Sequence, residues 1–230
     1  MKLSIVLPCR NEVGNIGRIV NSIRINGWNE SNSEVIVIND GSTDGTTELL
    51  CILGERYSNL KVINTSLRLG LGKSIHLGIT ESKYENIAVM DTDGIHDPSY
   101  LALMLKEKLN GIDLVIGSRY ISGGIMVGAL YPHLSKMMNR LVMVITNSNV
   151  QDQLCGYFVA NKKDLLRLRE NDFIGFGEYF IRLINFFEIN GIVKEIPTTH
   201  SVRIGGVRKS NRLEMTRAYL KTALNVRRGI

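Results

Sequence analysis

The first half of the chain alternates short, uninterrupted apolar runs with segments whose apolar residues recur at helical spacing. The apolar runs predict buried strands over 3–7, 35–38, 61–63, 87–90 and 114–116. Between these runs we expect helices after residue 11, through residue 53, over 74–82 and over 98–109, with Asn11 as the cap of the first. Apolar strands that alternate with helices predict an α/β fold whose mostly parallel sheet is covered by helices on both faces.

The second half of the chain has a less regular pattern. A glycine-rich loop is expected over 118–130, helical spacing recurs over 131–147, 162–169, 178–190 and 211–227, and a strand is expected over 192–197. The sequence shows no internal repeat and no convincing linker, so we expect one domain over 1–230.

The helical segment 130–145 carries a stripe of apolar residues. Its members are Leu134, Met137, Met138, Leu141, Val142 and Ile145. Lys136 and Arg140 lie beside the stripe, which is typical of a helix that lies on an anionic membrane surface. The alternative is that the stripe packs against the sheet.

Composition and charge exclude few classes of function. The 28 Lys and Arg against 22 Asp and Glu give a net charge of +6, which suits phosphate-bearing substrates, an anionic membrane or nucleic acid. The three cysteines form no C-x-x-C pair, which argues against a disulfide framework and favours a reducing compartment. No apolar run reaches the ~18 residues of a membrane helix. We therefore expect a cytoplasmic protein, at most peripheral on the cytosolic face of a membrane.

Polar clusters follow the predicted strands, where an open parallel sheet binds its ligands. They lie at 10–12, 40–44, 91–93 and 118–119. Asp91 and Asp93 come directly after an apolar run, and two such carboxylates can bind a Mg²⁺ or Mn²⁺ ion that bridges phosphate oxygens. The alternative is a helix cap and a solvated acid. Asp40 is a candidate for binding a base or ribose, and Asp44 a candidate cap for the next helix.

Two further segments carry candidate phosphate contacts. The segment 69–74 is similar to a phosphate-binding P-loop, but Leu67 stands where the first glycine belongs, so we interpret it as a glycine turn that opens a helix. Lys73 in this turn is a possible phosphate contact. The segment 203–209 combines three cations with two glycines and could close over a bound diphosphate, although an ordinary surface loop is an equal alternative. The four histidines show no zinc spacing.

Together these blocks resemble the inverting family 2 glycosyltransferases of the GT-A fold, especially the dolichol-phosphate mannose synthase branch. The matching blocks, in chain order, are Val6 to Glu12, Val37 to Thr46, Met90 to Asp93 with His96 and Pro98, Ile116 to Tyr120, the series Asp152, Gly156, Glu178 and Glu195 to Pro197, and the basic residues Arg203 and Lys209 with Gly206. The resemblance covers nearly the whole chain.

The resemblance implies a GT-A, Rossmann-like sheet with a C-terminal helical extension, and a role for each matched residue. The nucleoside would be held by Pro8, Asn11, Glu12 and Asp40; metal and diphosphate by Asp91 and Asp93; and phosphates of donor or acceptor by Arg119, Arg203 and Lys209. It also implies a nucleotide-sugar-binding half over 1–117 and an acceptor-binding half over 118–230. The chain departs from the branch at Ile95, where a Gln often completes the metal site, and at Phe158, where an Arg is missing.

The resemblance implies transfer of a hexose from GDP-mannose or a UDP-sugar to a polyprenyl phosphate, with a peripheral membrane contact or a membrane-protein partner. Transfer to a saccharide hydroxyl is the alternative within the enzyme class, and it would need a base such as Glu178. A nucleotidyltransferase and a non-catalytic nucleotide-sugar-binding protein also remain open. Nucleic-acid binding has no recognised motif and is not expected.

Overall fold

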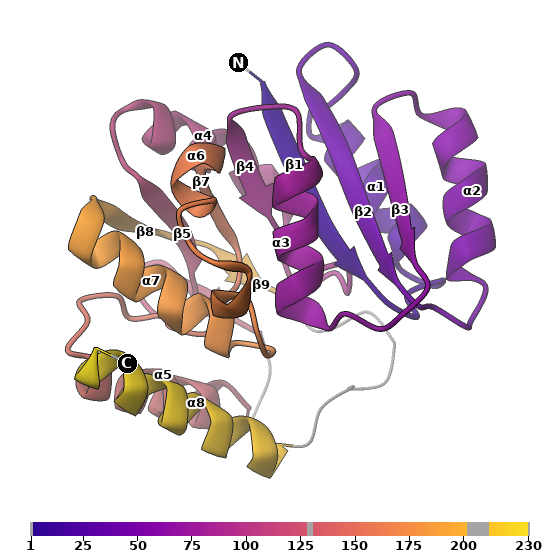
Figure 1. Cartoon of the computed structure of the whole chain (residues 1–230). Helices are drawn as coiled ribbons and strands as arrows, with labels where there is room; N and C mark the ends of the chain where they lie inside the picture. Colours follow the sequence, from indigo (N-terminus) through magenta and orange to yellow (C-terminus); the bar gives the residue numbers. More distant parts are fainter. Residues whose placement is uncertain (1, 128–130, 202–211, 230) are drawn as a thin grey trace.

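The computed structural model describes residues 2–127, 131–201 and 212–229 (Figure 1). Within these residues the chain forms a seven-stranded sheet in the order β3-β2-β1-β4-β7-β5-β8 and a two-stranded sheet of β6 and β9. The strands of the large sheet are β1 (Leu3–Cys9), β2 (Ser33–Asp40), β3 (Leu60–Thr65), β4 (Asn86–Val89), β5 (Leu114–Ser118), β7 (Phe158–Asn161) and β8 (Val193–Pro197). The small sheet pairs β6 (Ile125–Met126) with β9 (Thr199–His200).

The five strands expected in the first half are confirmed. Every residue of β1, β2 and β5 is buried, because these strands have neighbours on both sides and helices over both faces. Strand β3 lies at the edge of the sheet and alternates between buried, intermediate and exposed residues. The mostly parallel α/β sheet that the apolar runs predict is therefore the fold of this chain.

Strand β7 was not expected. It runs antiparallel between β4 and β5, with Val159 opposite both Ala88 and Val115. Its four residues are too few to show a period, so nothing local marks them as a central strand. β7 takes this position because its backbone pairs with both β4 and β5, which lie far from it in sequence.

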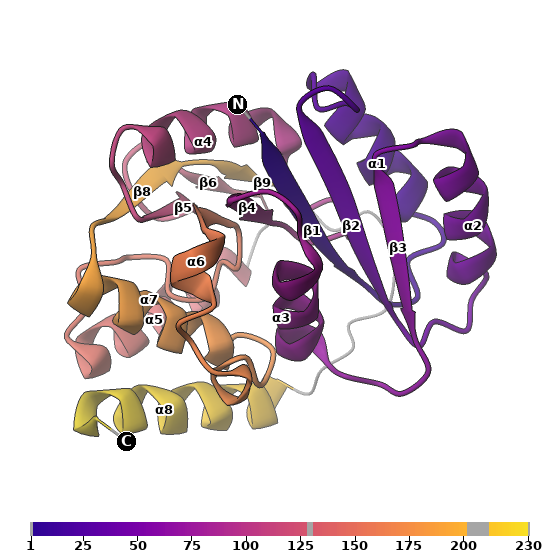
Figure 2. The same cartoon turned by 45° about the horizontal axis from the view of Figure 1, so that its top comes forward.

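Helices cover both faces of the sheet (Figures 1 and 2). One face carries α1 (Ile16–Ile25), α2 (Thr46–Arg56) and α4 (Leu101–Leu109), which the 3-10 turn Pro98–Tyr100 precedes. The other carries α3 (Leu71–Glu81), α6 (Lys162–Leu165) and α7 (Glu178–Asn190). Gly78 of α3 lies directly on Val6 of β1, so a larger side chain there would collide with the strand. This contact brings α3 close to the sheet beside the pocket described below.

Helices α5 (Tyr131–Thr146) and α8 (Arg212–Arg228) lie side by side below α7 (Figure 1). They share a small apolar cluster made of Val142, Ile181, Tyr219 and Ala223, against which Met138 and Ile145 pack. The stripe expected over 130–145 is thus divided. One part packs on this cluster with α8, whereas Leu134, Met137 and Leu141 are exposed.

Two local predictions are wrong. Asn11 does not cap α1: the cap position is Asn15, and Asn11 instead adopts a positive φ of 49°. The helix expected over 162–169 is only the short α6, after which the chain turns. The three cysteines are free thiols, as the sequence suggested. None of the helices in the described ranges is long and apolar enough to cross a membrane.

Candidate active site

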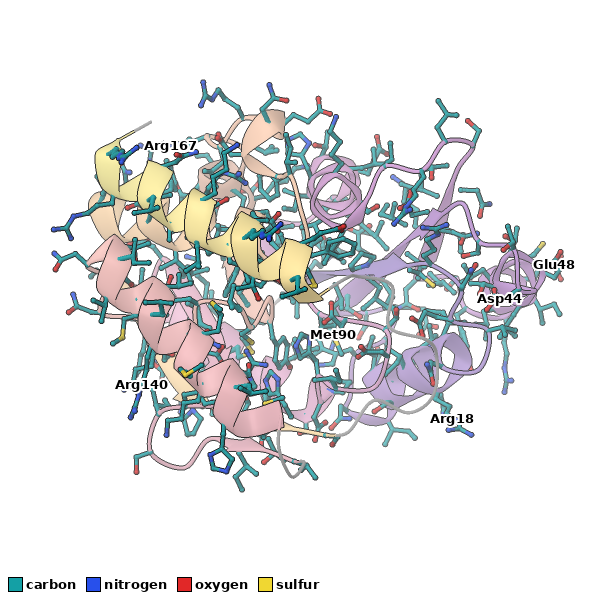
Figure 3. All side chains as sticks on the ribbon, turned by 90° about the horizontal axis from the view of Figure 1, so that it is seen from below. Arg18, Asp44, Glu48, Met90, Arg140 and Arg167 are labelled. Atoms are coloured by element: carbon teal, nitrogen blue, oxygen red, sulfur yellow. The ribbon has the colours of Figure 1, made fainter. Side chains whose placement is uncertain are left out.

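A cavity of about 250 Å³ opens where β1, β2 and β4 end and is closed on the other side by α7 and α8. Its first-half lining residues are Pro8, Cys9, Arg10, Glu12, Asp40, Arg68, Gly70, Leu71, Ser74, Asp91, Thr92 and Asp93. Its second-half lining residues are Leu154, Cys155, Gly156, Phe176, Gly177, Tyr179, Phe180, Met215 and Tyr219. Figure 3 views this region from below, with Met90, which precedes Asp91, near the beginning of α8. Five of the predicted site residues therefore meet in one pocket: Pro8, Glu12, Asp40, Asp91 and Asp93.

The turn that carries Asp91 and Asp93 is held by hydrogen bonds to its neighbours. The Thr92 hydroxyl donates to the carbonyl of Pro8 at 3.2 Å, which ties the turn to the end of β1. The Asp93 carboxylate accepts the N–H of Ile95 at 3.1 Å. The Asp93 residue is buried, and the Asp91 side chain is 39% exposed. Two carboxylates on one fixed turn, both facing the pocket, fit the oxygen ligands that Mg²⁺ and Mn²⁺ prefer.

Asp40 holds a loop of the pocket wall. Its carboxylate accepts the N–H of Leu69 at 2.6 Å and that of Gly70 at 3.0 Å, and the Thr65 hydroxyl donates to it at 3.3 Å. Gly70 has a φ of 86°, which glycine adopts without strain. Asp40 thus shapes the turn that the sequence placed at 69–74, besides facing the pocket itself.

The loops after β1 and β2 are locked together. The Asn11 side-chain oxygen accepts the N–H of Thr43 at 2.8 Å, and the backbone N–H of Asn11 donates to Ser42 at 2.9 Å. Asp44 accepts the N–H of Val13 and that of Thr46. Burial raises the pKa of Asp44, but these hydrogen bonds outweigh it and the pKa is lowered overall. Asn11 does not itself line the pocket but supports the loop that does.

Besides Asn11, three predicted residues lie outside the pocket lining. The Lys73 ammonium pairs with Glu170 at 3.3 Å on the surface. The Arg119 guanidinium is bound by Asp152, and only 11% of the Arg119 side chain is exposed. The Glu178 carboxylate accepts the N–H groups of Phe176 and Gly177 at 2.8 and 3.0 Å, at the beginning of its own helix. The predicted contacts Arg203 and Lys209 lie outside the described residues.

The sequence analysis did not predict the side of the pocket that α7, the loop before it and α8 form. Phe176 and Gly177 precede α7, Tyr179 lies in its first turn, and Met215 and Tyr219 come from α8. Tyr219 lies so close to Gly177 that a side chain at that position would touch its ring at 3.0 Å. The segment Gly175-Phe176-Gly177 before a helix was the available signal, because two glycines around one aromatic residue indicate a close approach of the chain. Arg68 was also missed, since a single arginine in a loop carries no pattern.

Comparisons with known proteins agree with this geometry. A dolichol-phosphate mannosyltransferase from Pyrococcus furiosus is 28% identical over 215 residues, which cover 91% of this chain and 59% of that protein. An undecaprenyl-phosphate mannosyltransferase from Micrococcus luteus is 28% identical over 213 residues, with 86% of this chain and 83% of that protein covered. This chain thus spans somewhat over half the length of its archaeal relative.

Solved structures share the fold. Glucosyl-3-phosphoglycerate synthase from Mycobacterium tuberculosis, crystallised with Mn²⁺, UDP and its product, superposes with a TM-score of 0.74 at 23% identity, over 100% of this chain and 80% of that one. At this identity the likeness concerns the arrangement of strands and helices alone. The model of the family described as "Glycosyl transferase family 2" matches residues 4–169, which contain the loops after β1 and β2 and the Asp91–Asp93 turn. On this match, together with the pocket that its strands form, the chain belongs to glycosyl transferase family 2.

Proposed function

We propose that this chain is a metal-dependent inverting glycosyltransferase that moves a hexose from a nucleoside-diphosphate sugar, GDP-mannose or a UDP-sugar, to a polyprenyl or dolichyl phosphate. One observation carries the proposal: a single pocket joins the strand-end residues of 1–117, the Asp91–Asp93 turn and an apolar wall from 118–230. Donor, metal and acceptor each have a chemically suitable surface in it. The names of the archaeal and bacterial relatives, both polyprenyl-phosphate mannosyltransferases, support the same acceptor class.

The donor would lie along the ends of β1 and β2. Glu12 and Asp40 offer carboxylates to the base or ribose, and Pro8 offers an apolar surface. Arg10 and Arg68 line the same pocket and bring positive charge to a diphosphate. The predicted contacts Arg203 and Lys209 would add to this charge.

Asp91 and Asp93 would hold a Mg²⁺ or Mn²⁺ ion, which when bound supplies positive charge to the departing diphosphate. The role of the chain itself is to keep the carboxylates of Asp91 and Asp93 on one rigid turn. The bond from Thr92 to Pro8 supports this role, because it joins the turn to the strand end that faces the nucleoside. Ile95, where the branch often has Gln, leaves the two carboxylates as the protein ligands of this turn.

A phosphate acceptor agrees with the position of Glu178. A lipid phosphate is already anionic and can attack the anomeric carbon in line without a general base, whereas a sugar hydroxyl needs one. The carboxylate of Glu178, the base considered for a hydroxyl acceptor, accepts backbone N–H groups at the start of α7 and is not part of the pocket lining. The apolar wall of Leu154, Phe176, Met215 and Tyr219 gives the first isoprene units a surface to pack on.

We infer that the chain works on the cytosolic face of a membrane, with α5 at the lipid surface. Leu134, Met137, Leu141 and Val144 of α5 are exposed by 49, 61, 44 and 69% and follow one another at spacings of three, four and three residues. The sequence of α5 contains no Asp or Glu, and Arg140 points from the side of α5 away from α8 (Figure 3). An apolar stripe flanked by cations suits an anionic membrane surface.

The test is transfer from labelled GDP- and UDP-sugars to a polyprenyl phosphate, with Mn²⁺ and with chelator. We expect label in the organic phase only with metal, and loss of transfer in Asp91→Asn and Asp93→Asn. Asp97→Asn is the matched control, because Asp97 lies close in sequence but is exposed and caps the 3-10 turn before α4. Label that moves only to a saccharide acceptor, or donor binding without any transfer, would contradict the proposal.

A further inference from the structure

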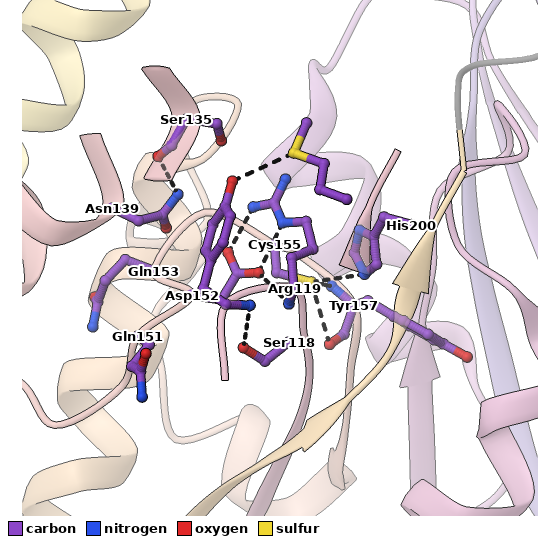
Figure 4. A network of polar contacts seen from close by, with 12 residues as sticks. Ser118, Arg119, Ser135, Asn139, Gln151, Asp152, Gln153, Cys155, Tyr157 and His200 are labelled. Carbon is purple, nitrogen blue, oxygen red and sulfur yellow. Dashed lines mark hydrogen bonds and ion pairs between the residues drawn. The ribbon is translucent and has the colours of Figure 1, made fainter. Parts of the chain in front are cut away.

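Behind the Asp91–Asp93 turn lies a buried cluster of His96, Cys155 and His200. The candidate ligand atoms of these residues lie within 4.8 Å of one another, and all three side chains are buried. His96 and His200 meet edge to face at 4.8 Å, and the Cys155 sulfur lies 3.9 Å from His200 Nε2. Figure 4 shows Cys155 and His200 beside the Arg119–Asp152 pair. A site of this composition suggests zinc at first, but the hydrogen bonds of His96 oppose that interpretation.

The N–H of Asp91 donates to Nδ1 of His96 at 2.9 Å. A backbone N–H can only donate, so Nδ1 carries the lone pair and the proton of the neutral ring lies on Nε2. Nε2 is therefore a donor. A histidine with Nδ1 engaged in this way and a proton on Nε2 has no lone pair to offer a metal. The cluster is a hydrogen-bonded support and not a second metal site.

We propose that His96 is a positioning residue for the metal-binding turn: its Nδ1 fixes the backbone of Asp91, and its ring, stacked on Tyr157, joins this turn to residues 155–157. The inference rests on the proposed metal role of Asp91 and Asp93. The two backbone segments that His96 joins both line the pocket: one carries Asp91, and the other continues from Cys155 to Gly156. Gly156 has a φ of 76° and lies against the Tyr179 hydroxyl, so this second segment is equally constrained.

The ring of His96 is itself held in place. It stacks on Tyr157 with ring centroids 4.8 Å apart and an interplanar angle of 13°, and the Tyr157 hydroxyl donates to the carbonyl of Asp97 at 2.8 Å. Both ends of the segment from Asp91 to Asp97 are thereby attached to residues 155–157. Since the segment from 91 to 97 begins with both carboxylates, the attachment sets their backbone before any ligand binds. Removing such a support of a metal ligand weakens metal affinity by about 10- to 100-fold.

Two substitutions of His96 distinguish the contribution of Nδ1 from that of Nε2. In His96→Asn the side-chain oxygen lies near the former Nδ1 and can accept the Asp91 N–H, whereas His96→Gln reaches the former Nε2 and leaves that N–H without its acceptor. We measure Mn²⁺ binding by the electron paramagnetic resonance of free Mn²⁺, alone and with GDP or UDP. His96→Gln should weaken Mn²⁺ binding about tenfold or more, and His96→Asn should stay close to wild type. His200→Phe is the matched control: the residue is equally buried against His96 but has no bond to Asp91, so Mn²⁺ binding should be unchanged.

A measurement on the unmodified protein does not depend on variant folding. In ¹⁵N-labelled protein, the N–H···N bond should give a scalar coupling between the Asp91 amide nitrogen and His96 Nδ1. Absence of that coupling, or equal loss of Mn²⁺ affinity in both His96 variants, would overturn the inference alone. Wild-type protein that binds no Mn²⁺ even with nucleotide would overturn the metal part of the proposed function, and this inference with it.

Discussion

The carboxylate of Asp152 binds the guanidinium of Arg119 with both oxygens, through Nε at 2.8 Å and a terminal nitrogen at 2.6 Å (Figure 4). The backbone N–H of Arg119 adds a third bond to the same carboxylate at 2.9 Å. Asp152 is fully buried. Burial by itself lowers the pKa of Arg119, but the pairing with Asp152 outweighs it, and the pKa of Arg119 is raised overall. The pair fastens the end of β5 to the segment before β7.

Breaking this pair should destabilise the fold. We expect Arg119→Met to lower the free energy of unfolding by about 3–5 kcal/mol, because it leaves the buried Asp152 carboxylate without its cation. Chemical denaturation followed by circular dichroism measures the change. The control is Arg24→Met, which removes an exposed pair with Glu30 and should change the free energy of unfolding far less, because exposed ion pairs contribute little. Equal effects of the two substitutions would show that the Arg119 pair is not structural.

Glu178→Gln should reduce stability without abolishing transfer. The Glu178 carboxylate accepts the N–H groups of Phe176 and Gly177 next to the beginning of α7, and a neutral amide at this place loses about 0.5–2 kcal/mol of stability. Thermal unfolding and the transfer rate, measured on the same preparation, check both parts. A variant of normal stability that has lost transfer would instead indicate that Glu178 is the base of a hydroxyl acceptor reaction.

The stability of the protein should fall as the pH is lowered from 7 to 5, in part through His200. Burial, reinforced by His96 and by the positive charge of Arg119 and only partly opposed by Asp152, lowers the pKa of His200 to about 2. The unfolded chain then binds a proton below its pKa of 6.5 that the folded chain does not, so stability is full above 6.5 and decreases below it. At pH 5 this amounts to about 2 kcal/mol for His200.

His200→Phe tests this dependence. The variant removes the titrating group, so its loss of unfolding free energy between pH 7 and pH 5 should be smaller than that of wild type by about this amount. Urea denaturation at the two pH values gives the comparison. An identical loss in both proteins would contradict the assignment to His200.

Met137→Asp should release α5 from anionic vesicles. Met137 is one of the four exposed apolar residues of α5, with Leu134, Leu141 and Val144. Withdrawing its side chain from a membrane while adding a negative charge should weaken binding about tenfold or more. Co-sedimentation with phosphatidylglycerol vesicles measures the binding. Ile52→Asp is the control, because Ile52 is 62% exposed on α2, away from the stripe. If the two variants bind alike, or wild type does not bind, the membrane role of α5 is wrong.

The sequence predicted the parts of the fold that local pattern decides. Strands β1, β2 and β5 could be located because parallel strands buried on both faces need continuous apolar runs. Strand β7 could not, since four residues have no readable period and their antiparallel pairing depends on two distant neighbours. The division of the α5 stripe was also hidden, because spacing alone does not say which of its residues meet α8.

The sequence likewise predicted only some of the residues of the candidate site. Asp40, Asp91 and Asp93 lie within three residues of the end of an apolar run, so their meeting in one pocket follows from the geometry of a parallel sheet. Phe176, in the loop before α7, and Tyr219, in α8, reach that pocket through packing of α7 and α8 that no sequence pattern predicts. Glu178, the base considered for a hydroxyl acceptor, lies outside the pocket lining, because Gly175 leaves room for its carboxylate to fold back onto the beginning of its own helix.

The insertion of β7 between β4 and β5 has a consequence for how this scaffold can change. The excursion that carries β6 and α5 leaves the sheet at the end of β5 and returns beside it, since Ile116 lies opposite Phe158. Both of its ends are pinned at neighbouring positions, so the intervening chain can be lengthened at a cost of only about 0.6 kcal/mol for each doubling. The segment between these two ends can therefore be replaced by that of a relative, while the sheet and its carboxylates stay in place. If the proposed function holds, grafting the corresponding excursion of a relative onto this sheet would change the pocket wall that Leu154 contributes to the acceptor.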